Sequence, residues 1–109
     1  MKKLTINEQI FLIAIWHLGD RAYGINIKDK ITDLTGNKIL FGTLYNTLDH
    51  LARKGFVTTE RKNTPAGQGG NNRVYYSLTK PGLRALQEAR NLQNNLWNGL
   101  PGRLFSEKD

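Results

Sequence analysis

Residues 42 to 55 read GTLYNTLDHLARKG, and a helix built from them has two unlike faces. At 100° per residue its apolar side chains gather on one side, which suits a hydrophobic core. These are Leu44, Leu48, Leu51 and Ala52, with Phe41 near them and Tyr45 at the border. The opposite side carries mainly short polar groups, whereas a merely solvated helix usually shows long glutamate and lysine pairs. Its residues are Gly42, Thr43, Asn46, Asp49, His50 and Arg53.

Two interpretations of this polar face are open from the helix alone. It belongs to an ordinary amphipathic surface helix, or its short side chains meet base edges in the major groove of DNA. The elements that follow in the chain favour the second interpretation.

A β-hairpin is predicted directly after this helix. Residues 56 to 61 are rich in β-branched side chains, and residues 73 to 78 alternate apolar with polar ones. Between them, residues 63 to 72 read NTPAGQGGNN, which can only be a loop. A hairpin with a long, glycine-rich tip directly after the helix at 42–55 is the wing of a winged-helix fold. Its base carries three cations with no acid from 61 to 80, a pattern that favours phosphate contact: Arg61, Lys62 and Arg73. For the tip residues themselves, a plain flexible loop is the alternative.

Two helices are predicted before residue 42. The first covers residues 4 to 18, with Thr5 or Asn7 as N-cap and Gly19 as its end. The second covers residues 25 to 34, with Ile27, Ile31 and Leu34 at core spacing, and it ends near Gly36. Three helices of which the third is polar on its outer face form a helix-turn-helix arrangement.

The first helix is apolar on nearly all sides. One set of its residues could face the protomer's own core: Ile6, Ile10, Ile13 and Leu18. A second set leaves almost no polar face, and we expect another subunit to bury it: Phe11, Leu12, Ile15 and Trp16. The alternative is a central core helix in a monomer.

A fourth helix is predicted from residue 80 to about 98. Thr79 is a strong N-cap, and Pro81 stands just inside the helix start, where its missing N–H costs nothing. Residues at alternating spacings of three and four form a seam that we expect to meet a partner subunit. The seam consists of Leu86, Ala89, Gln93, Leu96 and Leu100. Gly99, Pro101 and Gly102 end the helix, and we expect residues 103 to 109 to be a frayed tail.

Charge and composition limit the possible functions. The chain has 109 residues, enough for one domain, and a formal net charge of +7. Residues 36 to 80 hold seven lysines and arginines against two acidic residues, which suggests a polyanionic partner such as nucleic acid. A solvated basic surface is the alternative.

Several classes of site are disfavoured by the residue inventory. Without cysteine there are no disulfides, thiolates or cysteine zinc sites, and we take the cytoplasm as the default compartment. The basic start and the apolar run from 10 to 16 mimic a signal peptide, but Glu8 interrupts the approach and no cleavage site follows. His17 and His50 lie on different predicted helices, and no nucleophile has an evident base. We therefore expect neither an enzyme nor a cofactor or metal site.

The chain resembles the PadR family of bacterial transcriptional regulators from about residue 4 to residue 97. The resemblance is carried by the order and spacing of several short motifs. They are Tyr23-Gly24-Ile25, Gly42-Thr43-Leu44-Tyr45 with Leu48, Leu51 and Lys54-Gly55, and Gly69-Gly70 before Arg73, Tyr75-Tyr76 and Leu78-Thr79. It implies a winged helix-turn-helix repressor that binds palindromic operators as a homodimer through its C-terminal helix. A single C-terminal helix is similar to the family's short subgroup, which includes repressors of multidrug transporters.

Two departures from the family pattern are visible. Many members have a small polar N-cap before the Gly-Thr-Leu-Tyr motif, whereas Leu40 and Phe41 stand here. Asn71 and Asn72 occupy wing positions where basic residues are common. Base preference and affinity are therefore expected to differ.

The sequence thus predicts a mainly α fold with a small β-hairpin. Residues 1 to 79 form a winged helix-turn-helix domain, and residues 80 to 109 form a C-terminal dimerisation helix and tail. The predicted function is a homodimeric repressor that binds double-stranded DNA through helix 41–54 and wing 57–78. The alternative is a winged-helix protein-interaction module without sequence-specific DNA binding.

Roles can be assigned within the predicted DNA surface. Thr43, Asn46 and His50 are the candidates for base edges, and Asp49 would accept from cytosine or orient a neighbour. Tyr45 is expected to send its hydroxyl to a phosphate. Gly42 lies at the helix start, while Arg53 and Lys54 are expected to touch the DNA backbone.

Trp97 is a candidate ligand residue. In the transporter-repressor branch that the chain resembles, a tryptophan on this helix stacks planar drugs between subunits, which implies a planar hydrophobic effector. The alternative is that Trp97 simply fills the dimer interface.

Overall fold

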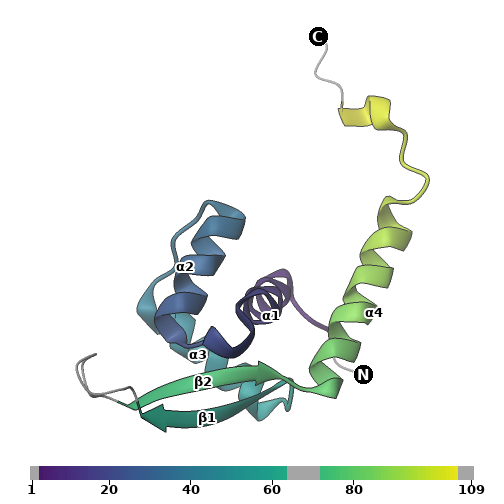
Figure 1. Cartoon of the computed structure of the whole chain (residues 1–109). Helices are drawn as coiled ribbons and strands as arrows, with labels where there is room; N and C mark the ends of the chain where they lie inside the picture. The colour runs from purple at the N-terminus through teal and green to yellow at the C-terminus, as the bar shows by residue number, and fades with distance from the viewer. Residues whose placement is uncertain (1–2, 64–71, 106–109) are drawn as a thin grey trace.

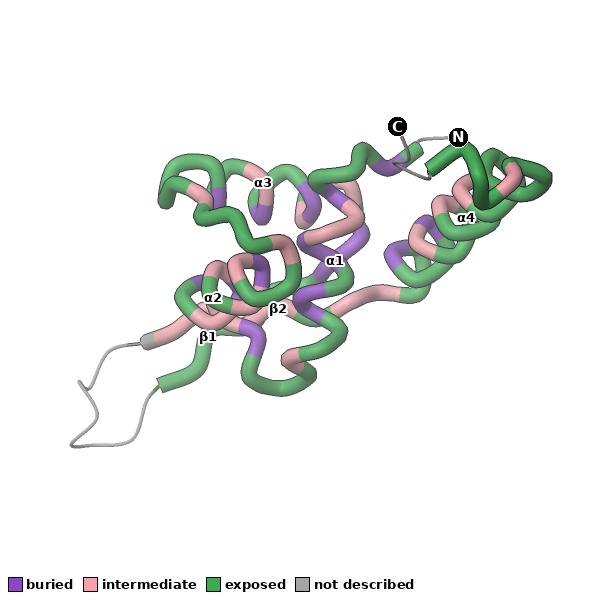
Figure 2. The backbone as a smooth tube through the Cα atoms, turned by 90° about the horizontal axis from the view of Figure 1, so that it is seen from above, coloured by how far each residue is buried: buried purple, intermediate pink, exposed green. Residues whose placement is uncertain are grey.

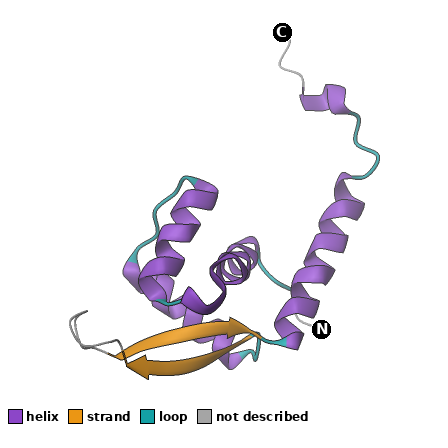
Figure 3. Cartoon of the chain, in the orientation of Figure 1, coloured by secondary structure: helices purple, strands orange, loops and turns teal. Residues whose placement is uncertain are grey.

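The computed structural model describes residues 3–63 and 72–105. Three helices pack together beside an antiparallel hairpin, and a fourth helix projects away from them (Figures 1 and 3). The elements are α1 (Ile6–Leu18), the 3₁₀ turn η1 (Gly19–Arg21), α2 (Gly24–Thr35), α3 (Phe41–Arg53), β1 (Val57–Asn63), β2 (Asn72–Leu78), α4 (Lys80–Trp97) and the 3₁₀ turn η2 (Gly102–Phe105). The predicted winged-helix fold is therefore confirmed. The wing tip at 64–71, with Gly69, Gly70 and Asn71, lies outside the described residues, as does the end of the predicted tail at 106–109.

Short-range signals fix the helix ends as the sequence predicts. The Thr5 hydroxyl accepts the Glu8 N–H at 3.1 Å, and the Glu8 carboxylate accepts the Thr5 N–H at 2.9 Å, which makes a capping box. Gly36 ends α2 in the left-handed conformation with φ 77°. In contrast, α3 begins after Leu40, whose side chain makes no capping hydrogen bond.

The core lies between the first three helices and the base of the hairpin. Its largest fully buried side chains are Phe11, Leu12, Ile15, Ile27, Leu44, Leu48 and Leu51. Ile6 and Ile13 are 58% and 39% exposed, so the prediction that they face the core is wrong. They lie on the side of α1 opposite to Phe11 and Ile15. Leu34 is also exposed, because the last turn of α2 extends past the core.

The predicted dimer contacts on α1 need correction. Phe11, Leu12 and Ile15 are 0%, 0% and 2% exposed within a single protomer, so they have no surface left for a partner. Their prediction as dimer residues is wrong, because α2 and α3 already cover this side of α1. These three residues belong to the protomer's own core instead. Trp16, at 63%, remains exposed.

The wing is tied to the beginning of α2. Strands β1 and β2 pair antiparallel from Val57 opposite Leu78 to Asn63 opposite Asn72. On the other edge of β2, Tyr23 forms an isolated bridge with Tyr75, and the Tyr76 N–H donates to the Ala22 carbonyl at 2.8 Å. The backbone before α2 therefore acts as a short third strand that fixes the angle of the wing.

Thr79 and Gly82 anchor α4 to the rest of the fold. The Thr79 hydroxyl donates to the Gly55 carbonyl at 2.6 Å and accepts the Gly82 N–H at 3.1 Å. Gly82 lies directly on the carbonyl of Phe56, where a Cβ would collide with backbone. Beyond Ala85 the helix becomes progressively exposed (Figure 2). The molecule measures 58 × 35 × 22 Å, and none of the described helices is both long and apolar enough to cross a membrane.

Candidate nucleic-acid interface

The polar face of α3 is exposed along its whole length. Its predicted DNA-contacting residues all lie on the surface, opposite the buried Leu44, Leu48 and Leu51. They are Gly42, Thr43, Tyr45, Asn46, Asp49, His50 and Arg53. The residues that the helical period predicted to lie on one side therefore form one continuous surface in the structure.

Arg53 and Asp49 form an ion pair on this face at 2.5 Å, one helical turn apart. Both side chains are more than half exposed, so the pair adds only about 0.3–0.5 kcal/mol to stability. A phosphate can therefore draw Arg53 away from Asp49 at little cost.

Glu8 connects the start of α1 to the end of α3. Its Oε2 lies 2.7 Å from the Lys54 Nζ and 3.8 Å from the His50 Nε2. Burial opposes ionisation of this carboxyl, but the Lys54 hydrogen bond, the Thr5 N–H and the nearby charges outweigh it and lower the pKa of Glu8. The expected contact of Lys54 with the DNA backbone is not supported, since its side chain is 16% exposed and its ammonium is held by Glu8. His50 remains more than half exposed at the edge of this cluster.

Tyr45 lies between the two helices of the helix-turn-helix unit. Its hydroxyl lies over Gly24, where a Cβ would have no room. Its ring is 48% exposed and stacks on Phe41, with centroids 6.5 Å apart and planes 11° apart. Burial first, and then the neighbouring Tyr45 and Asp49, raise the pKa of Tyr76 on the adjoining strand. A shallow groove between α2, α3 and β2 is lined by Tyr23, Gly24, Ile25, Tyr45, Arg73, Val74 and Tyr76.

The three wing cations do not share one face of the hairpin. Lys62 pairs with Arg73 across the strands, while Arg61 pairs with Val74 and so points to the other side. The Lys62 Nζ lies 4.8 Å from the centroid of the Tyr75 ring, and the Arg73 guanidinium lies 4.3 Å from that of Tyr23. These cation–π contacts hold two adjacent like charges in place. The wing therefore carries two positioned cations on one face and Arg61 on the other.

Sequence reasoning missed several members of this surface. Leu40 and Phe41 are 78% and 54% exposed at the start of α3, and the Lys28 Nζ lies 5.2 Å from the Phe41 ring centroid. The missing N-cap was a visible signal for the first two. Lys28 could not be found from the sequence, because its position follows from the angle between α2 and α3.

The predicted seam on α4 divides into two parts. Leu86 and Ala89 are half-buried against the protomer's own core, so this half of the seam is already covered. Gln93 is half-buried, whereas Leu96 and Leu100 are 63% and 45% exposed.

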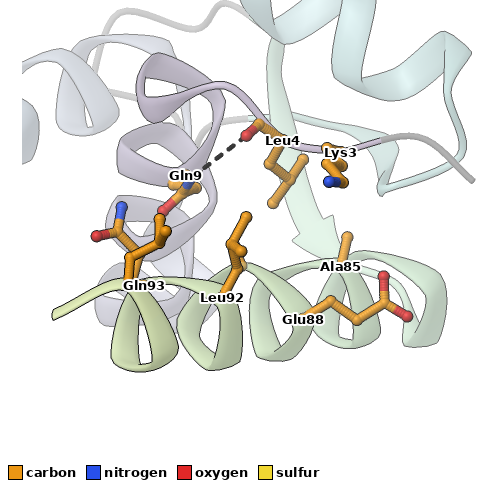
Figure 4. Close-up of a pocket in the computed structure, with 9 residues that line it drawn as sticks. Lys3, Leu4, Gln9, Ala85, Glu88, Leu92 and Gln93 are labelled. Atoms are coloured by element: carbon orange, nitrogen blue, oxygen red, sulfur yellow. Dashed lines mark hydrogen bonds between the residues drawn. The ribbon is translucent and has the colours of Figure 1, made fainter. Parts of the chain in front are cut away.

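An apolar groove runs along the exposed part of α4. It has a volume of about 230 Å³ and lies between α4 and the segment before α1 (Figure 4). The Gln9 side chain donates to the Leu4 carbonyl at 3.3 Å and fixes the opposite wall. Leu4, Ala85, Leu92 and Leu96 supply its apolar lining.

Trp97 is 57% exposed at the end of α4. Its ring stacks on Phe105 of η2, with centroids 5.6 Å apart and planes 22° apart. The predicted frayed tail is thus partly ordered, since residues 102–105 form a 3₁₀ turn.

Known proteins with similar sequences and structures indicate the family of this chain. A family model described as the transcriptional regulator PadR-like family matches residues 14–88. A PadR-like transcription factor from Bacteroides fragilis is 25% identical, with a TM-score of 0.71 over 84% of this chain and 82% of that one. A PadR family regulator from Eggerthella lenta is 27% identical, with a TM-score of 0.69 over 94% and 85% of the two chains.

The fold has a further solved counterpart. F93 from STIV, a winged-helix DNA-binding protein, superposes with a TM-score of 0.64 at 20% identity, over 90% of this chain and 98% of that one. A search of the curated proteins found no match. Because the family model covers more than half of the sequence, the chain belongs to the PadR-like family of transcriptional regulators, which are not enzymes.

Proposed function

We propose that the protein is a homodimeric repressor that binds a palindromic DNA operator. Two copies of α3 enter successive major grooves about 34 Å apart, and the wings lie along the flanking backbone. The observation that carries this proposal is the unbroken exposed polar face of α3, opposite three buried leucines and next to the cationic wing. A dimer bound over a promoter represses by excluding the polymerase, and the cytoplasm is the compartment where such a regulator acts.

Gly42 supports close approach of α3 to DNA. It lies in the first turn of α3, and glycine is a weaker helix former than alanine. A Cβ at this position would have no protein atom within 4 Å, so packing does not require the glycine. Its missing side chain instead leaves room for a base edge or a phosphate.

Dimerisation is supported by exposed apolar side chains on two neighbouring helices. Leu92 and Leu96 are exposed on α4, as are Ile6, Ile13 and Trp16 on α1. A second copy of α4 is the partner that we propose for the groove beside Leu92, because an apolar helix face of this kind rarely stays in water.

A protein-interaction module is the alternative function, and salt dependence separates the two. Binding of a fluorescent 30-base-pair duplex pool should be measured between 50 and 300 mM salt. A repressor that releases counterions should lose affinity steeply and linearly in log salt. Failure to bind duplex DNA even at 50 mM salt would leave the interaction module as the better proposal.

Asn46→Ala should weaken binding to a selected operator by about 1–3 kcal/mol and relax the preference at one position of each half-site. The amide is exposed at the centre of the α3 face and can pair bidentately with adenine. Selection from a randomised duplex pool measures the preference. An unchanged selected motif would remove Asn46 from the base-reading residues.

Arg61→Ala, Lys62→Ala and Arg73→Ala should each weaken binding to all sequences alike and reduce the salt slope by about one. The effect is uniform because we assign these cations to phosphates on the two sides of the wing. Parallel titrations on selected and random duplexes at several salt concentrations measure it. A variant that changes the selected motif but keeps the salt slope would contradict the assignment.

We also propose that the protein binds a planar, hydrophobic small-molecule effector. Trp97 is half-exposed, and the Phe105 ring stacks on it. Aromatic stacking accepts many planar molecules without fitted hydrogen bonds. The alternative for Trp97 is burial against the second subunit.

A further inference from the structure

An apolar patch lies at the start of α3, next to the polar face of this helix. Leu40 and Phe41 are 78% and 54% exposed, and neither belongs to the core. Leu40 holds the N-cap position without a capping hydrogen bond, although serine, threonine or asparagine would stabilise the helix there. Neither residue therefore contributes to the buried core, and Leu40 does not cap the helix with its side chain.

The Phe41 ring is held in place from two sides. It stacks on Tyr45, and the Lys28 Nζ lies 5.2 Å from its centroid. A ring fixed in this way loses little side-chain entropy when it meets another surface. The adjacent ammonium also puts a cation where a DNA backbone would pass the end of α3.

We propose that Leu40 and Phe41 read thymine through its C5-methyl group at one position of each operator half-site, with Lys28 on a neighbouring phosphate. The inference rests on the proposed function, since α3 must enter the major groove. In that groove the thymine methyl is the apolar group on the base edges, while the other edge groups donate or accept hydrogen bonds. An apolar side chain placed there favours thymine, because a purine would turn a polar edge group toward it without a partner and cytosine would lack the methyl contact.

The chemistry of the surroundings favours DNA over a protein partner for this patch. It is continuous with the exposed polar residues of α3, beginning at Gly42 and Thr43. Lys28 is half-buried, and its ammonium places a positive charge beside the Phe41 ring. An apolar contact is thus combined with a phosphate contact, as major-groove recognition requires.

Removal of single methyl groups from DNA tests the proposal. The full chain is first used to select duplexes from a randomised pool. Each thymine of the selected operator is then replaced in turn by deoxyuridine, which lacks only the methyl group. Wild-type protein should lose about threefold to tenfold in affinity at one symmetric pair of positions. Phe41→Ala should bind the thymine and deoxyuridine duplexes equally at that pair.

Two further variants separate recognition from folding. Leu40→Ser should reduce the same discrimination while it unfolds at an equal or higher temperature, because serine caps α3. Leu34→Ala removes an equally apolar exposed side chain from the last turn of α2 and should keep the discrimination unchanged.

The outcomes distinguish this inference from the proposed function. Selective binding with equal affinity for thymine and deoxyuridine at every position would overturn the methyl contact alone. Discrimination that survives in both Phe41→Ala and Leu40→Ser would also overturn it. If the wild-type protein selects no sequence at all, both the inference and the proposed function fail.

Discussion

Lys54→Met should lower the free energy of unfolding by about 3 kcal/mol. The Lys54 ammonium is the closest partner of the Glu8 carboxylate, which is 6% exposed. Without it, a buried negative charge keeps only the Thr5 N–H and the more distant His50. Urea denaturation at neutral pH, followed by circular dichroism, measures the loss.

This effect should depend on pH in a defined direction. Because the pKa of Glu8 is lowered in the folded protein, its stabilisation is present above the pKa of an unfolded glutamate. It is lost as the pH falls through the folded pKa, since protonated Glu8 no longer needs Lys54. The difference between wild type and Lys54→Met should therefore be largest near neutral pH and shrink in acid.

Matched variants make this prediction specific. Arg53→Met removes the neighbouring cation from an exposed pair and should cost less than about 1 kcal/mol. The double variant Glu8→Gln, Lys54→Met removes both charges and should recover most of the stability lost in Lys54→Met. Equal losses in Arg53→Met and Lys54→Met would show that the ion pair between Glu8 and Lys54 adds no more stability than the exposed pair between Asp49 and Arg53.

Leu96→Glu should convert the dimer into a monomer and weaken binding to a two-half-site operator by about 100-fold or more. In the proposed dimer it would bring two carboxylates into an apolar interface beside the groove lined by Leu92. Binding to a single half-site should change little, because α3 is untouched. Sedimentation velocity and titration on one-site and two-site duplexes measure the two parts.

Asn95→Glu is the matched control for Leu96→Glu. It adds the same charge to the same turn of α4, at an exposed position that does not line the groove between α4 and the segment before α1. It should remain dimeric. A dimer that survives Leu96→Glu would move the interface to the exposed side of α1 with Ile6, Ile13 and Trp16. Truncation after residue 82 is a poorer test, because Ala85, which would be lost, belongs to the protomer's own core.

Much of the fold could be predicted because local sequence patterns determine it. The period of α3 identified Leu44, Leu48 and Leu51 as buried and its polar face as exposed. Thr5 and Thr79 were recognised as helix caps from their residue type and position. In these cases neighbours within one turn determine the outcome.

The rest depends on how separate elements meet. The pair between Glu8 and Lys54 joins positions 46 residues apart, so no local pattern contains it. The core side of α1 was also ambiguous, since nearly every side of that helix is apolar and only packing on α2 and α3 selects Phe11 over Ile13. Likewise, the strand register places Arg61 on the other face of the wing from Lys62 and Arg73.

Gly82 joins α4 closely to the winged-helix body, so the two should move as one rigid unit. Its backbone lies against Phe56 with no side chain between them, so the helix cannot pivot freely at its root. From this joint the remaining 15 residues of α4 extend about 22 Å. In the proposed dimer, a change of about 10° in the angle between the two α4 helices would therefore displace the two recognition helices relative to each other by about 4 Å, a third of the width of a major groove. If the proposed dimer binds its proposed effector near the far end of α4, the expected consequence for DNA binding is a changed distance between the two recognition helices.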